Sequence, residues 1–277
     1  MCMVSTMIAI GAASPFPLAG AHVLITGATR GIGLALAREA TQRGARLSVL
    51  ARPSDRLSAV ARELGACSIP TDLRDLDAVA GVISAAEANL GPLDVVINNA
   101  AMMGTGALAT LSAAGLRDTL TANLLAPAEL ARASAASMIT RHRGVIVAVS
   151  SFAGEMALRN IGAYSTSKGA LTHLTRVLQR ELRGTGVRAL PVLLGGVDTE
   201  LIRENDADPV AGPAARRLSA IPADAPDVIA AKILAAVESG RRRPLAVPAA
   251  GLPLIGLRGL PSNLADAILF GLPRSYR

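Results

Sequence analysis

The stretch "HVLITGATRGIG", residues 22–33, decides the fold. It begins with apolar and β-branched residues, as a buried strand does, and continues with glycines at positions 27, 31 and 33. Small residues between a strand and a helix let backbone N–H groups and the helix N-terminus approach a pyrophosphate. A tight turn that needs glycine for its backbone angles is the alternative. The motif lies in the first strand–helix turn, which favours dinucleotide binding.

The rest of the chain repeats this alternation of strand and helix. Near-continuous apolar runs alternate with helical patterns rich in Ala and Leu, which predicts a parallel sheet covered by helices on both faces. The expected fold class is therefore α/β, a Rossmann-type doubly wound parallel sheet of about seven strands. Strands are expected at 22–26, 46–51, 67–70, 93–98, 144–150, 187–194 and 244–248. Helices are expected at 31–43, 54–64, 75–89, 112–141, 163–183 and 225–239.

We expect one domain, residues 20–248, between two dissimilar ends. Residues 1–19 are apolar but carry no Lys or Arg before the apolar run, so they fit a flexible arm better than a secretory signal. Residues 249–277 form an apolar C-terminal extension broken by Gly and Pro. We expect the extension to pack on the domain or at a subunit interface. A weak contact with a membrane surface, making the protein peripheral, is the alternative.

The composition excludes several classes of function. Of the 277 residues, 51% are hydrophobic and 18% charged, which suits a globular protein. The arginines behind the net charge of +7 are scattered and no aromatic stripe accompanies them, which argues against nucleic acid as a partner. The two cysteines make no disulfide framework and the three histidines have no metal-like spacing. We therefore expect no metal and a reducing, cytoplasmic compartment.

The end of the second strand indicates which dinucleotide binds. An acidic residue there would bond the ribose 2′-OH of NAD. This strand instead ends in Ala51 and Arg52, and Asp55 comes only after Pro53. Arg52, with Arg30 in the glycine loop, would pair with a 2′-phosphate, which favours NADP(H) over NAD(H). The alternative is that both are solvated arginines of an arginine-rich chain.

The segment "YSTSK" contains one of only two tyrosines and one of only two lysines in the chain. A spacing of four places Tyr164 and Lys168 on one face of a helix. A free phenol has a pKa of about 10 and is a reluctant base at neutral pH, but a nearby ammonium lowers that pKa. The pair is therefore expected to serve acid/base chemistry, with Lys168 lowering the pKa of Tyr164.

Three further motifs occur in a fixed order: "NNAA" (98–101) after the fourth strand, "TANLLAP" (121–127) in a helix and "VSS" (149–151) at the end of the fifth strand. With "TGATRGIG" and "YSTSK", they resemble the short-chain dehydrogenase/reductase family from about residue 19 to about residue 248. The resemblance implies oxidation of a secondary alcohol or reduction of a ketone or aldehyde. It also implies a homodimer or homotetramer packed through helices 112–141 and 163–183.

The resemblance assigns four catalytic residues. Tyr164 would be the acid/base, Lys168 would tune it and hold the nicotinamide ribose, Ser151 would orient the substrate, and Asn123 would support a proton relay. Ser150 competes for the serine role. Ser151 matches the family spacing better, because it lies 13 residues before Tyr164 and 28 after Asn123.

The resemblance also assigns a cofactor site. It places Asp72 and Leu73 near the adenine, Asn98 and Ala100 along the cofactor ribose, and Val197 and Thr199 at the nicotinamide carboxamide. The cofactor-binding residues are expected to be Gly27, Thr29, Arg30, Gly31, Ile32, Gly33, Arg52, Asp72, Leu73, Asn99, Ala100, Ala101, Tyr164, Lys168, Val197 and Thr199. Two positions depart from the family pattern: Ala101 stands for a usual Gly, and Gly195 for a usual Pro, which should loosen the turn after the sixth strand.

The substrate is the least determined part of the prediction. Residues 152–163 and 200–217 are expected to form the substrate walls, and residues 200–217 offer no aromatic platform. Met102 and Met103 follow the cofactor loop and would contact substrate, although Met more often fills a core. A lipophilic carbonyl compound is expected. The alternative from another class is a sensor or scaffold that binds NADP(H) without turnover, which would not need the Ser-Tyr-Lys set.

Overall fold

The computed structural model describes residues 15–156, 159–195 and 224–249. Within these ranges a seven-stranded parallel sheet has the order β3-β2-β1-β4-β5-β6-β7. The strands are β1 (His22–Thr26), β2 (Arg46–Ala51), β3 (Cys67–Pro70), β4 (Val95–Asn98), β5 (Gly144–Ser151), β6 (Val187–Leu194) and β7 (Leu245–Val247). The doubly wound α/β fold predicted from the alternating pattern is confirmed.

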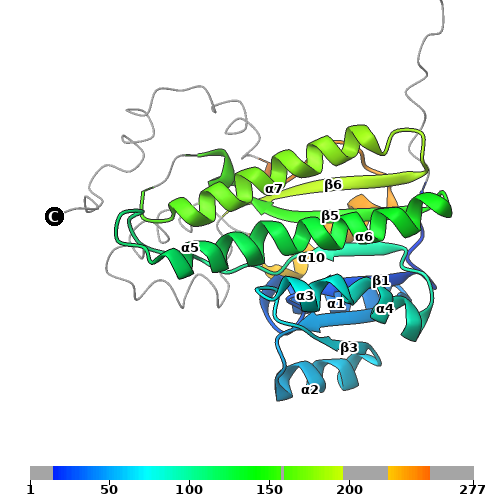
Figure 1. Ribbon diagram of the computed structural model, residues 1–277. Helices are drawn as coiled ribbons and strands as arrows, with labels where there is room; N and C mark the ends of the chain where they lie inside the picture. The colour runs from blue at the N-terminus through cyan, green and yellow to red at the C-terminus, as the bar shows by residue number, and fades with distance from the viewer. Residues whose placement is uncertain (1–14, 157–158, 196–223, 250–277) are drawn as a thin grey trace, which may run out of the picture.

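Helices cover both faces of the sheet (Figure 1). On one face lie α1 (Gly31–Gln42), α2 (Asp55–Leu64) and α10 (Pro226–Glu238). On the other lie α3 (Leu76–Ala80), α4 (Val82–Leu90), α6 (Ala126–Thr140) and α7 (Gly162–Glu181). Every residue of β1 and β4 is buried, which explains why these strands read as continuous apolar runs rather than alternating ones.

Two of the expected helices are interrupted. The segment 75–89 is divided at Gly81 into α3 and α4. The segment 112–141 is α5 (Ala113–Leu120), a π-helical turn η1 (Thr121–Leu125) and α6. The extra residue in a π-turn leaves a local bulge, a feature frequent at functional sites. Here the turn carries Asn123, whose side chain is fully buried.

The order of the strands positions the site. The order reverses between β1 and β4, and in open α/β sheets ligands bind at such a switch point, outside the carboxyl ends of the strands. Because all the strands are parallel, the glycine loop after β1, "NNAA" after β4 and "VSS" at the end of β5 meet at this carboxyl edge.

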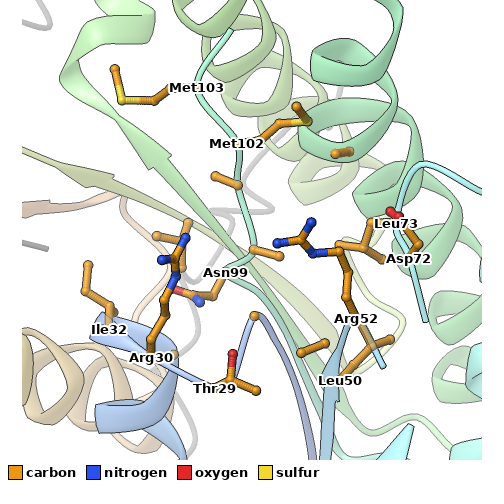
Figure 2. Close-up of a pocket in the computed structure, with 18 of the residues that line it drawn as sticks. Thr29, Arg30, Ile32, Leu50, Arg52, Asp72, Leu73, Asn99, Met102 and Met103 are labelled. Carbon is orange, nitrogen blue, oxygen red and sulfur yellow. The ribbon is translucent and has the colours of Figure 1, made fainter. Parts of the chain in front are cut away.

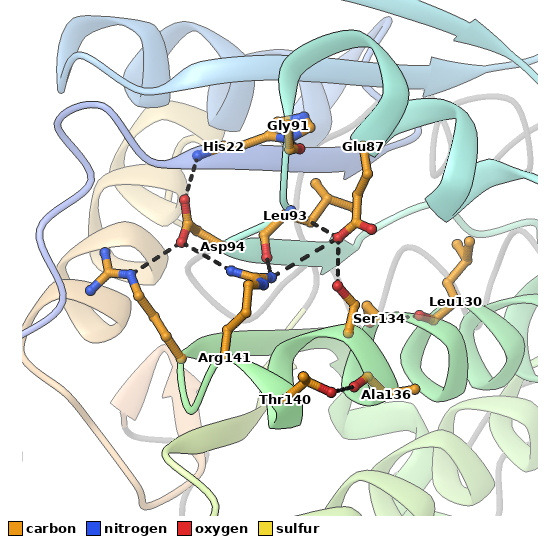
Figure 3. A network of polar contacts seen from close by, with 12 residues as sticks. His22, Glu87, Gly91, Leu93, Asp94, Leu130, Ser134, Ala136, Thr140 and Arg141 are labelled. Atoms are coloured by element: carbon orange, nitrogen blue, oxygen red, sulfur yellow. Dashed lines mark hydrogen bonds and ion pairs between the residues drawn. The ribbon is translucent and has the colours of Figure 1, made fainter.

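The amino edge of the sheet carries a polar network (Figure 3). The buried His22 ring contacts Gly91 O through Nδ1 at 2.7 Å and Ser48 Oγ through Nε2 at 2.9 Å. Burial lowers the pKa of this histidine, so the ring is neutral at neutral pH. The His22 backbone N–H donates to Asp94 Oδ2 at 3.0 Å, and Arg143 Nε donates to Asp94 Oδ1 at 3.1 Å. The network ties together the starts of β1, β4 and β5.

The last residues of the expected N-terminal arm pack on the domain. Phe16 and Leu18 are buried, and the Phe16 ring lies between the guanidinium groups of Arg143 at 4.2 Å and Arg188 at 5.5 Å. Residues 1–14, and all but the first residue of the extension 249–277, lie outside the described residues. The domain boundaries stay a prediction. In the part of the chain that is described, no helix combines the length and the apolar character needed to cross a membrane.

Candidate active site

A cleft of about 880 Å³ opens at the carboxyl edge. It is lined by Gly27, Thr29–Gly33, Leu50–Ser54, Arg56, Thr71–Arg74, Asn99–Met103, Ala122, Val149–Ser151, Tyr164, Lys168, Leu194 and Gly195. Fourteen expected cofactor residues fall in the described ranges, and the structure brings all of them together here. Val197 and Thr199 lie outside the described residues. Asn98 is buried in β4 and does not line the cleft.

The glycine loop leaves room for a phosphate. A methyl group on Gly33 would collide with the Gly27 carbonyl oxygen and would come within 2.6 Å of Asn99 Nδ2. Asn99 Nδ2 in turn donates to Thr26 O at 3.0 Å, which fixes the loop against "NNAA". The N-cap residue of α1, Arg30, makes no side-chain capping hydrogen bond, and the first residues of α1 line the cleft. These features fit the pyrophosphate of a dinucleotide.

Arginine side chains surround the adenine end of the cleft. Figure 2 shows Arg30 and Arg52 reaching into it from the first and second strand–helix turns, and Arg56 also lines it. The Arg52 guanidinium is exposed and makes no hydrogen bond or ion pair with the residues that the structure describes. In the described part of the chain, β2 ends in Ala51 and Arg52 without a carboxylate. A phosphate group at this point would meet the positive charge of Arg52.

One carboxylate, that of Asp72, does lie nearby, and it is already paired. Arg74 holds it with Nη2 2.6 Å from Oδ2, and the same guanidinium reaches Asp118 of α5 at 3.4 Å. The hydrogen bond from Arg74 is the main reason that the Asp72 pKa is lowered, with Arg52 a smaller one. Sequence reasoning missed Arg56 and Arg74 as lining residues. The spacing of two residues between Asp72 and Arg74 was the sequence feature that could have indicated their ion pair.

The segment "VSS" at the end of β5 contacts α7, the helix that carries Tyr164 and Lys168, at three consecutive residues. Val149 O accepts a hydrogen bond from Lys168 Nζ at 2.8 Å. Ser150 Oγ donates to Lys168 O at 2.8 Å. Ser151 lines the cleft and hydrogen-bonds the Tyr164 hydroxyl. The Ser150 hydroxyl is therefore engaged with the helix backbone, and Ser151 is the serine beside the tyrosine.

Burial sets the acid/base properties of the pair. Removal from water raises the pKa of Tyr164, and the hydrogen bond with Ser151 works against that rise. Burial also lowers the pKa of Lys168 to about 8. The sequence led us to expect the opposite direction for the tyrosine. The difference arises because the Lys168 ammonium donates to Val149 O and lies 5.9 Å from the Tyr164 ring centroid. Desolvation of the tyrosine therefore outweighs the electrostatic effect of the ammonium on its pKa.

Asn123 holds the segment that follows β4. Its Oδ1 accepts from Met102 N at 2.9 Å, and its Nδ2 donates to Met102 O at 2.8 Å and to Ser167 Oγ at 3.1 Å. Both amide hydrogens are thus donated within the protein, and Asn123 does not line the cleft. The π-turn places this side chain where it fixes the path of Met102 beside the cofactor site.

Apolar side chains surround Tyr164 on the substrate side. Met103 and Met156 pack with Tyr164 against Ala153 and Ile161. Gly106 N donates to the carbonyl of residue 160 at 2.8 Å, so the segment after β4 is joined to the one before α7. Residues 157–158 and the expected wall 200–217 lie outside the described residues. Nowhere in the described ranges do three His, Cys, Asp or Glu side chains come together as metal ligands.

The turn after β6 contains one of the two departures from the family pattern. Gly195 N donates to Val247 O at 2.8 Å, and a methyl group on Gly195 would lie 3.0 Å from Pro248 Cδ. The start of this turn is therefore held by β7 even without a proline. Ala101, the other departure, lines the cleft.

Comparison with known proteins agrees with this geometry. The family model described as short chain dehydrogenase matches residues 21–209. A ketoacyl reductase, HetN, of Nostoc sp. is 35% identical over 185 residues, covering 65% of this chain and 64% of that protein. Gluconate 5-dehydrogenase of Gluconobacter oxydans is 33% identical over 198 residues, covering 70% of this chain and 77% of that protein. The chain thus spans less than two thirds of the ketoacyl reductase.

A solved structure shares the same architecture. It is a metagenomic short-chain oxidoreductase in complex with NADP, with a TM-score of 0.67 and 33% identity, covering 81% of this chain and 93% of that one. The chain belongs to the short-chain dehydrogenase/reductase family. Members of this class are oxidoreductases that act on CH–OH groups, and the resemblance drawn from the ordered motifs is confirmed.

Proposed function

We propose that this protein is an NADP(H)-dependent oxidoreductase that interconverts a secondary alcohol and its carbonyl compound. The observation that carries the proposal is the meeting of Ser151, Tyr164 and Lys168 at one end of a cleft whose other end is a glycine loop flanked by arginines. A protein that only senses the cofactor has no use for a tyrosine that is hydrogen-bonded to a serine and lines the cofactor cleft.

NADP(H), when bound, supplies or accepts the hydride. The residues of this chain hold the proton and the substrate oxygen. In reduction, the Tyr164 hydroxyl gives its proton to the carbonyl oxygen, while the Ser151 hydroxyl donates a hydrogen bond that stabilises the developing negative charge. In oxidation the same tyrosine takes the proton from the alcohol.

Lys168 and Asn123 support this step. Lys168 Nζ, held on Val149 O, would bond the nicotinamide ribose and stabilise the tyrosinate. Asn123 shapes the cofactor wall through Met102. A contribution of Asn123 to a proton relay would run through Oδ1, because both its amide hydrogens are donated to protein acceptors.

The preference for NADP(H) rests on charge. Arg30, Arg52 and Arg56 line the adenine end, and the Asp72 carboxylate is neutralised by Arg74. A 2′-phosphate would pair with Arg52 in a charge-assisted hydrogen bond. Arg52→Ala should therefore lower the affinity for NADPH by about tenfold or more and leave the affinity for NADH nearly unchanged, as measured by fluorescence titration. Equal weakening of both cofactors would remove the 2′-phosphate assignment.

The substrate that best fits is lipophilic. The wall beside Tyr164 contains Met103, Met156 and Ile161, and adaptable Met side chains suit an apolar ligand of irregular shape. The relatives named above act on unlike substrates, a ketoacyl group and gluconate, and do not narrow this choice.

We also propose a cytoplasmic homodimer or homotetramer, with weak membrane contact through residues 249–277 as a lesser alternative. Exposed apolar side chains on neighbouring helices support self-association: Leu125 at the end of η1, Ile139 near the end of α6, and Leu174 and Val177 on α7. Light scattering of the purified chain tests the oligomer. Vesicle co-sedimentation before and after truncation at Pro248 tests the membrane contact.

The deciding experiment is a panel of ketones and secondary alcohols with NADPH and NADH, followed by nicotinamide absorbance. We expect turnover of apolar members with NADPH. Tight NADPH binding without turnover of any member would favour the sensor or scaffold instead. Faster turnover with NADH than with NADPH would keep the oxidoreductase and overturn the cofactor preference.

A further inference from the structure

The turn of α7 that carries Tyr164 and Lys168 is tied to β5 by hydroxyl groups that touch no reacting atom. Ser150 Oγ donates to Lys168 O at 2.8 Å. Thr172 Oγ1, one turn further along α7, donates to Ser150 Oγ at 2.7 Å and lies 2.9 Å from the same Lys168 O. All three residues are buried. The Lys168 carbonyl is therefore held by the Ser150 hydroxyl, which the Thr172 hydroxyl orients in turn.

At one point of the contact between α7 and the segment after β5, two backbones meet without side chains between them. Gly154 and Gly169 meet there, and a methyl group on Gly154 would lie 2.5 Å from Gly169 N. Two backbones that meet at glycines have no side chains to interlock, so packing at this point resists sliding weakly. Directional hydrogen bonds at Lys168 O supply the resistance instead.

Sliding of the helix would matter because its neighbours on β5 are consecutive. Val149 O binds Lys168 Nζ, Ser150 Oγ binds the Lys168 backbone, and Ser151 bonds the Tyr164 hydroxyl. Alternation along the strand turns the Ser150 side chain towards the face covered by α7. One residue of the strand therefore anchors the helix between the two that contact its reactive groups.

We propose that Ser150 and Thr172 are positioning residues that fix the axial position of α7 relative to β5. They thereby maintain the hydrogen bond from Lys168 Nζ to Val149 O and the one between the Tyr164 hydroxyl and Ser151. This inference rests on the proposed oxidoreductase function. It gives a role to the first serine of "VSS", the residue that the sequence left as a competitor for substrate contact. A displacement of about 1 Å in such groups costs on the order of a hundredfold in rate.

The kinetic test compares four variants in the panel reaction. Ser150→Ala removes one anchor, and Thr172→Val removes the other at nearly constant volume. Thr172→Ser restores the hydroxyl. Ser165→Ala is the matched control, because Ser165 Oγ is buried on the same helix and has no hydrogen-bond partner in the described structure.

We expect kcat to fall about tenfold or more in Ser150→Ala and Thr172→Val, with KM and NADPH affinity within about threefold of wild type. Thr172→Ser should recover most of kcat, and Ser165→Ala should leave it unchanged. The pH dependence of kcat should move in the two damaged variants only. A kcat within twofold of wild type in both would overturn the proposal, as would an equal loss in Ser165→Ala.

A second readout needs no turnover. The chain has only two lysines, so ¹⁵N-lysine labelling gives two Nζ signals, and Lys232 is exposed and paired with Asp224 as an internal reference. Thr172→Val should move the Lys168 signal at fixed pH and leave that of Lys232 in place. An unchanged Lys168 signal would overturn the proposal. Wild type that turns over no substrate while Lys168 still responds would instead count against the proposed function alone.

Discussion

The two edges of the sheet differ in whether their charged side chains have partners within the protein. At the amino edge, the Asp94 carboxylate accepts a hydrogen bond from the His22 backbone N–H and forms an ion pair with Arg143. Arg141 lies 3.9 Å from the same carboxylate (Figure 3). At the carboxyl edge, Arg52 finds no partner in the described residues, and Lys168 Nζ is bonded only to a neutral carbonyl there. The first arrangement is complete without a ligand. The second leaves positive charge for one to bind.

This contrast assigns stability to one edge and activity to the other. At the amino edge, networks of paired charges stabilise the starts of the strands. At the carboxyl edge, a buried ammonium without a carboxylate partner destabilises the fold and is retained for function. Variants at the carboxyl edge should therefore change activity with little loss of stability. Variants at the amino edge should do the reverse. Four predictions test that division.

The largest effect is expected from Tyr164→Phe. Removing the hydroxyl removes the proton donor and should lower kcat by about 10²–10⁴-fold. NADPH affinity and melting temperature should stay close to wild type, because the ring remains packed against Ile161. Stopped-flow absorbance and calorimetry measure both. Turnover within a few-fold of wild type would show that another group holds the proton.

The second-largest effect is expected from Gly33→Ala, which should weaken binding of the cofactor. The added methyl group meets the Gly27 carbonyl and Asn99. Overpacking of this kind costs about 1–3 kcal/mol, so this carboxyl-edge variant, unlike the others, should also lose stability. NADPH affinity should fall about tenfold to a hundredfold. Gly81→Ala is the control, because its methyl group would meet nothing closer than 3.8 Å. Titration calorimetry compares the two, and equal NADPH affinities in them would exclude a tight glycine cradle.

Lys168→Met should lower kcat by less than Tyr164→Phe does, yet stabilise the fold. The Lys168 pKa is about 8 in the folded protein, against an ordinary value of 10.5 for lysine. Between these pH values the unfolded chain binds more protons, so wild-type stability rises with pH. Below pH 8 both states are protonated, and the variant should be more stable by roughly 3 kcal/mol. This advantage should shrink as pH approaches 10.5.

The control for that measurement is Lys232→Met at the exposed ion pair with Asp224. Urea unfolding from pH 7 to 10.5 should show no such convergence with wild type for this variant. If the stability difference between wild type and Lys168→Met is independent of pH, the Lys168 ammonium is not strained by burial.

Asp94→Asn should give the smallest effect, confined to stability. The variant keeps the shape but loses the charge that Arg143 and Arg141 share, which should lower the free energy of unfolding by about 1–3 kcal/mol. The kcat and NADPH affinity should be unchanged. Glu181→Gln, exposed on α7 without a hydrogen bond or ion pair in the described ranges, is the control. A fall in kcat without a fall in stability would contradict the division between the edges.

Much of the fold was predictable because its signals are local. Four strand ranges, those of β1, β2, β3 and β6, agree with the structure to the residue. Their apolar runs are bounded by Gly, Pro or charged residues, which mark ends clearly. The interruption at η1 was missed, although Pro127 at the start of α6 is a local signal of a break. The contact that the bulge makes was not visible in the sequence, because Asn123 bonds Met102, 21 residues away.

The sequence by itself determined the glycine loop, the helical pairing of Tyr164 with Lys168, and the arginine at the end of β2, since each depends on spacing within a few residues. Only the tertiary structure decided that Ser151 rather than Ser150 bonds the tyrosine, that Arg74 neutralises Asp72, and that the pKa of Tyr164 is raised. These properties depend on side-chain direction and on loss of water, and both arise only when segments distant in sequence pack together.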